Sequence, residues 1–208
     1  MAKKPVLLTT CYLPPAGWFS LLDSRPVVLE KHETYTRQSY RNRCHIGSER
    51  GMLPLSVPVN KPNGNHTRID EVQIFNGEKW YLKHWRAIQS AYESSPFFLY
   101  YADDLKPFFT GKHRNLWKYN LELIETLCSL TDISPDISFT ESFKKESENV
   151  VDLRTFFTPK KPVQGTFPPY TQVFSDRHGF LPGLSILDVI FNLGPETKSY
   201  LSRIRLPF

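Results

Sequence analysis

The stretch from Arg37 to Val59, RQSYRNRCHIGSERGMLPLSVPV, limits the possible fold more than any other part of the chain. Two extended runs flank the loop GSERG, which has a glycine at each end and the length of a hairpin connection. Side chains alternate along a strand, so each run has two distinct faces. The first run has a cationic face of Arg37, Ser39, Arg41, Arg43 and His45, and an opposite face of Tyr40, Asn42, Cys44 and Ile46. The second run has an uncharged face of Leu53, Leu55, Val57 and Val59, which predicts a strand with that face in a core.

The start of the chain has the pattern of a βαβ unit. Val6 to Thr10 is an apolar run rich in β-formers, Ala16 to Asp23 has helical spacing, and Val27 to Leu29 is extended again. The ligand crevice of such a unit lies at the carboxyl end of the first strand, which places Cys11 and Tyr12 at its mouth. Cys11 is therefore a candidate nucleophile and Tyr12 a candidate substrate contact. The alternative is that both side chains fill the core.

The middle of the chain predicts three successive helices, over 79–92, 96–109 and 116–130. The first carries Trp80, His84, Ile88 and Tyr92 on one stripe, where His84 is either a hydrogen-bonded core residue or a catalytic base. Ser185 can cap a further helix near the end of the chain. The polar stretch 143–150 is expected to be a weakly ordered surface loop. We therefore expect an α/β or α+β fold with a mixed sheet, a βα(β) opening, a hairpin and a mostly helical half packed on them.

The length fits a single domain over 1–208, β-rich over 1–77, mostly helical over 78–131 and mixed over 132–208. The net charge of +5 comes from 26 basic and 21 acidic residues that are interspersed, so the chain lacks the basic stripe of a nucleic-acid-binding protein. No apolar run reaches the length of a membrane span, and the N-terminal apolar run is too short for a signal peptide. These features predict a cytoplasmic protein that does not insert into membranes.

The sequence lacks the motifs of several common kinds of site. The glycine-rich phosphate loops GxxxxGK[ST] and GxGxxG do not occur, nor do GxSxG, HExxH and CxxC. Three cysteines, an odd number, predict reduced thiols rather than a disulfide framework. His32, Glu33, His45 and His178 could converge on a metal, but no pair of them has ligand spacing on a predicted helix. We therefore expect neither a metal nor another cofactor.

Six ordered segments carry a resemblance that covers nearly the whole chain. They are TTCYLPPAGWF, RQSYRNRCHI, LPLSVPV, IDEVQIFNGEKWYLKHWRAIQSAY with SSPFF, DLRTFFTPKKP, and PPYTQVFSDRHGFLPGLSILDVIFNLGP. Together they resemble the WbqC-like family, in its shorter variety typical of Bacteroidetes. The family opening has Gln-Pro where this chain has Thr10-Cys11. The resemblance implies a role in modifying sugars for O-antigen and other surface polysaccharides, as acyl or aminoacyl transfer to an amino sugar.

The residues and the resemblance together predict a transferase that acts on a nucleotide-activated sugar. Guanidinium groups bind phosphate through charge-assisted, bidentate contacts. The predicted binding residues are Tyr12, Arg41, Asn42, Arg43, His45, Arg154, Tyr170 and Gln172, with His84 and Cys11 as candidate catalytic groups. Two alternatives are an ATP-using nucleotidyltransferase and a non-catalytic module that binds glycan or nucleic acid through Trp80, Trp85 and Trp117. The sequence does not define an oligomeric state.

Overall fold

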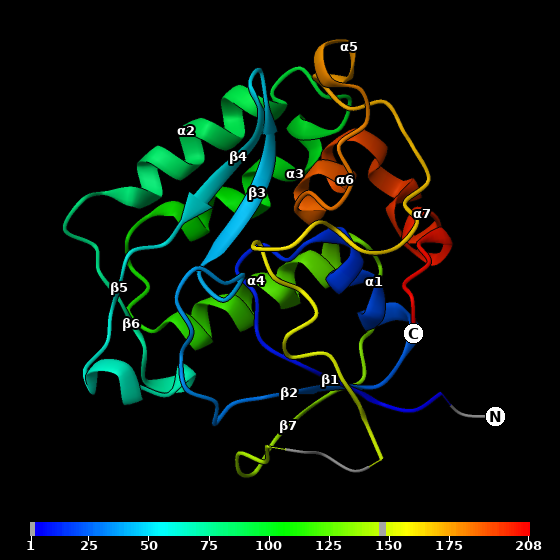
Figure 1. Cartoon of the computed structure of the whole chain (residues 1–208). Coiled ribbons are helices and arrows are strands. Elements are labelled where there is room, and N and C mark those ends of the chain that lie inside the picture. Colours follow the sequence, from blue (N-terminus) through cyan, green and yellow to red (C-terminus); the bar gives the residue numbers. More distant parts are fainter. Residues whose placement is uncertain (1–2, 146–148) are drawn as a thin grey trace.

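A four-stranded parallel sheet lies at one end of the molecule (Figure 1). The computed structural model describes residues 3–145 and 149–208, so residues 146–148 of the predicted polar loop lie outside the described residues. The strands are β1 (Val6–Leu8), β2 (Val27–Leu29), β7 (Ile137–Phe139) and β8 (Val151–Asp152). Their spatial order is β7-β2-β1-β8, and β1 pairs with β2 from Val6 opposite Val27 to Leu8 opposite Leu29. β1 and β2 are largely buried, which suits their apolar sequences, whereas β7 and β8 are partly exposed.

The order of these strands defines a crevice. From β1 the chain passes through helix α1 (Ala16–Ser24) to β2 and then to β7 on the same side, whereas β8 pairs on the other side of β1. The direction of winding therefore reverses between β1 and β8. In open parallel sheets, ligands bind outside the carboxyl ends of the strands at such a reversal.

The predicted hairpin forms a sheet of its own. Strand β3 (Arg43–Ser48) pairs with β4 (Gly51–Ser56), and a two-residue turn of Glu49 and Arg50 replaces the predicted five-residue loop. Gly51 has a φ of +97°, which only glycine adopts readily. Two further short strands, β5 (Val59–Asn60) and β6 (Gln73–Ile74), form a second antiparallel pair.

The prediction of a cationic face from Arg37 to His45 holds only within β3. Cys44 and Ile46 are fully buried while Arg43 and His45 are partly exposed, so the alternation holds within β3. It fails before Arg43, because Gln38 has a φ of +53° and the chain turns there. On β4, Leu55 is buried as predicted, but Leu53 near the hairpin tip is 36% exposed.

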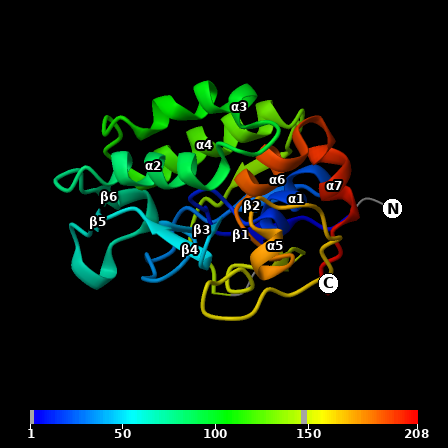
Figure 2. The ribbon, with the colours of Figure 1, turned by 90° about the horizontal axis from the view of Figure 1, so that it is seen from above.

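Helices cover one side of the hairpin and the sheet, as Figure 2 shows. They are α2 (Trp80–Tyr92), α3 (Phe98–Leu105) with the 3-10 turn η3 (Lys106–Phe109), and α4 (Leu116–Leu130). The stripe predicted for α2 is buried from Trp80 to Tyr92. Asn115 caps α4, because its side chain accepts a hydrogen bond from the Lys118 amide. Two single-turn 3-10 segments, η1 (Gly64–His66) and η2 (Ile69–Glu71), precede this layer.

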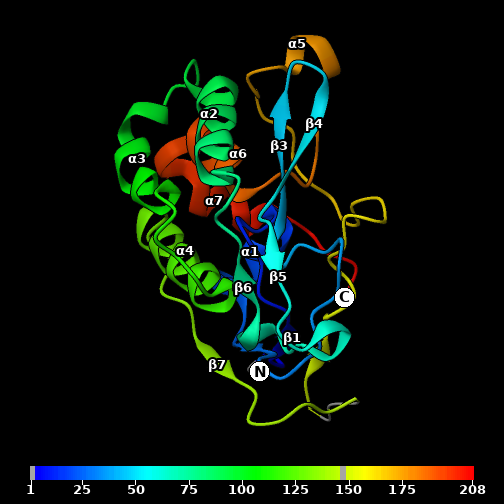
Figure 3. The same ribbon diagram turned by 90° about the vertical axis from the view of Figure 1, so that its left-hand side faces the viewer.

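The C-terminal helices pack against α1, and the C-terminus lies beside α1 and α7 (Figure 1). They are α6 (Ile186–Leu193), the 3-10 turn η4 (Gly194–Glu196) and α7 (Thr197–Arg203). The Ser185 side chain caps α6 as predicted. The short helix α5 (Ser175–His178) lies beside the hairpin tip, as Figure 3 shows. There Arg177 pairs with Glu49 at 2.8 Å.

The predicted fold class is confirmed, because a βα(β) opening, a hairpin and a helical half are all present. The parallel strands and the hairpin lie in separate sheets. The buried apolar residues of the opening, hairpin and helices form one core cluster. In the described part of the chain, no helix is long and apolar enough to cross a membrane.

Candidate functional site

Polar side chains join the carboxyl ends of three parallel strands. Glu30 follows β2, Thr140 follows β7, and Arg154 follows β8 by two residues. The Glu30 carboxylate accepts hydrogen bonds from the Thr140 hydroxyl at 2.8 Å and from Arg154 Nη1 at 3.3 Å. Glu30 is only 1% exposed, so its charge depends on these partners and on the His32 amide, which donates at 2.8 Å.

Arg154, a predicted phosphate ligand, uses all of its side-chain hydrogen-bond donors within the chain. Its Nε donates to Asp152, its Nη1 to Glu30 and the Lys144 carbonyl, and its Nη2 to Asp152 and the Lys145 carbonyl. A guanidinium group has five N–H bonds, and these contacts use all of them. Arg154 could donate to a ligand only by giving up one of these partners.

Arg41 forms the second buried pair of this edge. Its Nε and Nη2 donate to the two Glu33 carboxylate oxygens at 2.7 and 2.5 Å. Asn120 of α4 holds the Arg41 backbone by donating to its carbonyl at 2.7 Å. Burial raises the pKa of Glu33, although the bonds from Arg41 act in the opposite direction. Arg41 is thus held by Glu33 in the floor of the site and is not a free cation.

A hollow of about 530 Å³ opens over these charges. This volume falls in the usual range for small-molecule sites. Its walls are Glu33, Thr34, Thr36, Arg41, Phe143, Lys145, Asp152, Arg154 and Thr155. Three cationic and two acidic side chains therefore face one open space, beside the reversal point of the sheet.

Two further arginines are close in the chain to residues that line this hollow. Arg37 follows Thr36 directly, and Arg43 is two positions from Arg41. Burial raises the pKa of Tyr35, whereas the positive charges of Arg41, Arg37 and Arg43 act to lower it. Arg37 is exposed, and Arg43 is partly exposed with its Nε bonded to the Ser56 hydroxyl at 2.9 Å. Within the described residues neither forms an ion pair.

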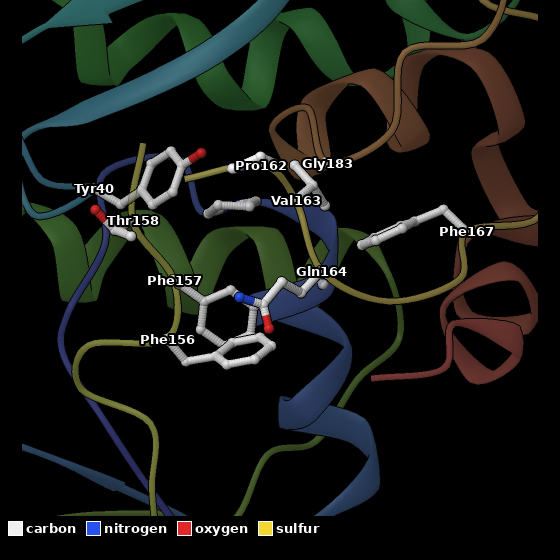
Figure 4. Close-up of a pocket in the computed structure, with 11 residues that line it drawn as sticks. Tyr40, Phe156, Phe157, Thr158, Pro162, Val163, Gln164, Phe167 and Gly183 are labelled. Carbon is white, nitrogen blue, oxygen red and sulfur yellow. The ribbon is translucent and has the colours of Figure 1, made fainter. Parts of the chain in front are cut away.

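A smaller apolar cavity adjoins the charged hollow (Figure 4). Consecutive residues line the two spaces: Tyr40 and Phe156 face the cavity, and their neighbours Arg41 and Thr155 face the hollow. The remaining walls are Pro15, Gly17, Phe157, Thr158, Pro162, Val163, Gln164, Phe167 and Gly183. The cavity measures about 30 Å³ and lies at the N-terminal end of α1.

The Tyr40 hydroxyl connects this cavity with His45, whose Nδ1 lies 3.4 Å away. Burial and the nearby Arg43 lower the pKa of His45. Burial also raises the pKa of Tyr40 to about 12. At neutral pH the pair is therefore a neutral imidazole beside a protonated phenol.

Tyr12 and His84 lie inside the core and bond each other. The Tyr12 hydroxyl is 2.8 Å from His84 Nδ1, Trp80 packs on both rings, and Tyr119 stacks on Tyr12. Tyr12 is 0% exposed and His84 6%. Burial lowers the pKa of His84 to about 4. Cys11 is also fully enclosed, and burial raises the pKa of its thiol, so it is protonated at neutral pH.

Tyr170 and Gln172 meet a different carboxylate. Asp188 of α6 accepts hydrogen bonds from the Tyr170 hydroxyl at 2.5 Å and from Gln172 Nε2 at 2.8 Å. Gln172 also exchanges two bonds with the Leu181 backbone. Burial raises the pKa of Asp188. Asn42, the last predicted ligand, donates to the Val57 carbonyl at 2.8 Å and extends the pairing of β3 and β4.

The structure thus places Arg41 and Arg154 in the walls of one hollow and Arg43 and His45 on β3. Tyr12, His84, Tyr170 and Gln172 lie in buried networks elsewhere. Sequence reasoning missed Glu30, Thr140 and Asp152, and it placed Arg37 on the cationic face without counting it among the ligands. A signal for Glu30 was present, because Glu30 directly follows the apolar strand VVL. Within the described residues, no three His, Cys, Asp or Glu side chains gather in a group that could hold a metal, and Cys11, Cys44 and Cys128 are free and buried.

The fold is that of an α/β protein whose parallel sheet carries buried ion pairs at its carboxyl edge, beneath an open hollow. The chain belongs to the WbqC-like protein family, which matches residues 10–165. It is also 26% identical, over 230 aligned positions, to an uncharacterised protein of Mycobacterium tuberculosis, Rv1507c. That alignment covers 98% of this chain and 99% of the relative. No solved structure gives a significant match.

Proposed function

We propose that this protein is a transferase that binds a nucleotide-activated amino sugar at the carboxyl edge of its parallel sheet. The reaction class is acyl or aminoacyl transfer in surface-polysaccharide synthesis, as the resemblance to the WbqC-like family implies. One observation carries the binding part of the proposal. The hollow of about 530 Å³ at the reversal of strand order is lined by Thr36 and Arg41, and close to these in the chain are Arg37 and Arg43, which have no ion-pair partner among the described residues.

Diphosphate is the ligand group that this arrangement favours. Arg37 and Arg43 supply positive charge, while the buried pairs Glu33–Arg41 and Glu30–Arg154 keep the floor of the hollow rigid. Charge-assisted bonds from arginine to phosphate are about twice as strong as neutral ones. The hydroxyl groups of Thr34, Thr36 and Thr155 offer further donors and acceptors to a sugar.

Replacing Arg43 with Leu separates binding from stability. Arg43 is partly exposed and bonds only a hydroxyl, so the melting temperature should change little. Affinity for a sugar nucleotide should fall by about ten- to a hundredfold, the equivalent of a charge-assisted bond of roughly 1.5–3 kcal/mol. Calorimetric titration with UDP-glucose measures the affinity, and a thermal melt measures the stability.

Two matched variants complete this test. Arg50→Leu makes the same change at the exposed hairpin tip and should leave both quantities unchanged. Arg41→Leu strands the buried Glu33 charge and should lower the free energy of unfolding by roughly 3–5 kcal/mol. A large loss of stability in Arg43→Leu, or an unchanged affinity, would contradict the proposal.

ATP-dependent nucleotidyl transfer is a second candidate, favoured by the order of the strands. Numbered along the chain, the parallel strands lie in the order 3-2-1-4, with α1 starting after the first strand, as in one half of a nucleotide-binding sheet. The HxGH signature of such enzymes is missing, since Pro15-Ala16-Gly17-Trp18 stands at the start of α1. ATP binding that is stronger than UDP-sugar binding in the same titrations would favour this candidate. A stacking module has little support, because Trp80 and Trp117 are only 4% and 6% exposed.

A further inference from the structure

The volume of the apolar cavity beside the charged hollow limits which chemical groups can enter it. A cavity needs about 10–15 Å³ to hold one water molecule, and an engineered cavity that binds benzene measures about 150 Å³. The cavity here measures about 30 Å³. It therefore has room for two or three small atoms but not for a sugar ring or a nucleobase.

Glycines hold the cavity at this size by letting the segment 156–167 lie close to the core. A methyl group on Gly17 of α1 would lie 3.1 Å from the ring of Phe167, and one on Gly183 would collide with the Val163 side chain. The φ of Gly183 is +72°, a conformation that disfavours any other residue there. The walls of the cavity are thus set by backbone contacts and by the rings of Phe156 and Phe157.

The cavity is apolar inside and polar at its margin. Pro15, Phe156, Phe157, Val163 and Phe167 supply carbon surface. Tyr40 and Thr158 carry hydroxyl groups on one side, as Figure 4 shows, and Gln164 adds a side-chain amide. A group that suits this lining has a methyl end for the interior and an amide for the margin, because buried amide atoms need hydrogen-bond partners.

We propose that this cavity recognises the acetamido group of an N-acetylated sugar nucleotide. The inference rests on the proposed function, since the diphosphate must occupy the neighbouring charged hollow. The methyl group lies among the phenylalanine rings, and the amide meets Tyr40, Thr158 and Gln164. Acyl groups longer than acetyl are excluded by Val163 and Phe167.

Three ligands test the proposal in calorimetric titrations: UDP-glucose, UDP-N-acetylglucosamine and UDP-N-butanoylglucosamine, all uncharged at the second carbon. For the unaltered protein, the acetylated ligand should bind about tenfold more tightly than UDP-glucose. The difference arises because the acetamido group buries one methyl group and forms about one additional hydrogen bond. The butanoyl ligand should bind at least about tenfold more weakly than the acetyl ligand, because overfilling a packed site is unfavourable.

Two variants change the size of the cavity in opposite directions. Val163→Ala removes two methyl groups from a residue that is 39% exposed, and should restore butanoyl binding to within about threefold of acetyl binding. Gly17→Ala adds a methyl group that points at Phe167 and should abolish the preference for acetyl. Leu82→Ala, at an equally exposed site on α2, is the control and should leave the ligand order unchanged.

The outcomes separate the two proposals. Equal affinities for UDP-glucose and UDP-N-acetylglucosamine, both weakened by Arg43→Leu, would overturn the acetamido assignment and leave the proposed function standing. An unchanged ligand order in Val163→Ala would overturn it as well. No measurable binding of any of the three ligands would overturn both.

Discussion

At the scale of single residues, burial rather than residue type decides which polar side chains can act on a ligand. Arg41 and Arg43 are two positions apart, yet Arg41 is enclosed with Glu33 while Arg43 keeps most of its donors free. His84 and His45 differ in the same way, because Trp80 and Tyr119 enclose the Tyr12–His84 pair whereas His45 is partly exposed on β3. The half-exposed member of each pair is therefore the better candidate for ligand contact.

The buried His84 should make stability depend on pH in a defined window. An unfolded histidine takes up a proton below pH 6.5, but in the fold burial lowers the pKa of His84 to about 4. The unfolded state thus binds the additional proton between these values, and stability should fall as the pH falls from 6.5 to about 4. The gap corresponds to about 3 kcal/mol.

His84→Gln removes this titration while an amide can still bond the Tyr12 hydroxyl. The free energy of unfolding, measured by urea melts at pH 7 and pH 4.5, should depend less steeply on pH in this variant than in the unaltered protein. His66→Gln, at an exposed residue of η1, is the control. Equal slopes in the His84 variant and the unaltered protein would show that the folded protein protonates His84 over the same pH range as the unfolded state.

At the scale of elements, sequence periodicity predicted most helices and strands because each has one apolar face. The bounds of α4 were predicted as 116–130, and Ser185 caps α6 as predicted. The region 37–42 was predicted as a strand but is a turn, because Gln38 has a positive φ. A glutamine in the sequence gives no signal for that backbone conformation. The two-residue strand β8 is too short to show alternation, so the approach of Arg154 to Glu30 was not visible in the sequence.

Strand β4 is an edge strand whose Pro54 protects it from pairing with other chains. The Val57 amide donates to the Asn42 carbonyl, so these two residues form a hydrogen-bonded pair. Along an antiparallel ladder, hydrogen-bonded pairs alternate with pairs that are not hydrogen-bonded. In this register Pro54, opposite His45, lies at a position whose amide would point away from β3. A proline there has no N–H to offer a further strand.

Pro54→Val should therefore increase self-association. The variant restores an outward N–H between the exposed Met52 and Ser56 on a strand with little charge. Sedimentation at rising protein concentration should show a larger mean mass than for the unaltered protein. Adding Met52→Lys should reverse the effect, since charged side chains at an edge oppose pairing. An unchanged mass in Pro54→Val would mean that other features protect this edge.

At the scale of the whole molecule, segments from both ends of the chain complete the same structure. The backbone of Ser185 bonds His45 of the hairpin, and that of Ile186 bonds Pro14 before α1. Helix α6 also packs on α3, and α7 packs on α1. The candidate site thus depends on distant parts of the chain, which explains why sequence periodicity alone predicted its elements but not how its residues come together.

Removing the chain after Pro182 should prevent folding rather than trim a surface. Ile186, Leu187, Val189, Ile190 and Phe191 of α6 are each at most 1% exposed, and burying one such side chain contributes roughly 1.5–3 kcal/mol. Their combined loss exceeds the roughly 5–15 kcal/mol by which folded domains are stable once Tyr200 and Leu201 of α7 are also removed. Circular dichroism and a thermal melt of the purified truncate should show no cooperative transition. Removal of only Pro207 and Phe208, which are exposed, should preserve it. A truncate after Pro182 that melts cooperatively would show that the sheet, hairpin and first helices form a core without α6 and α7.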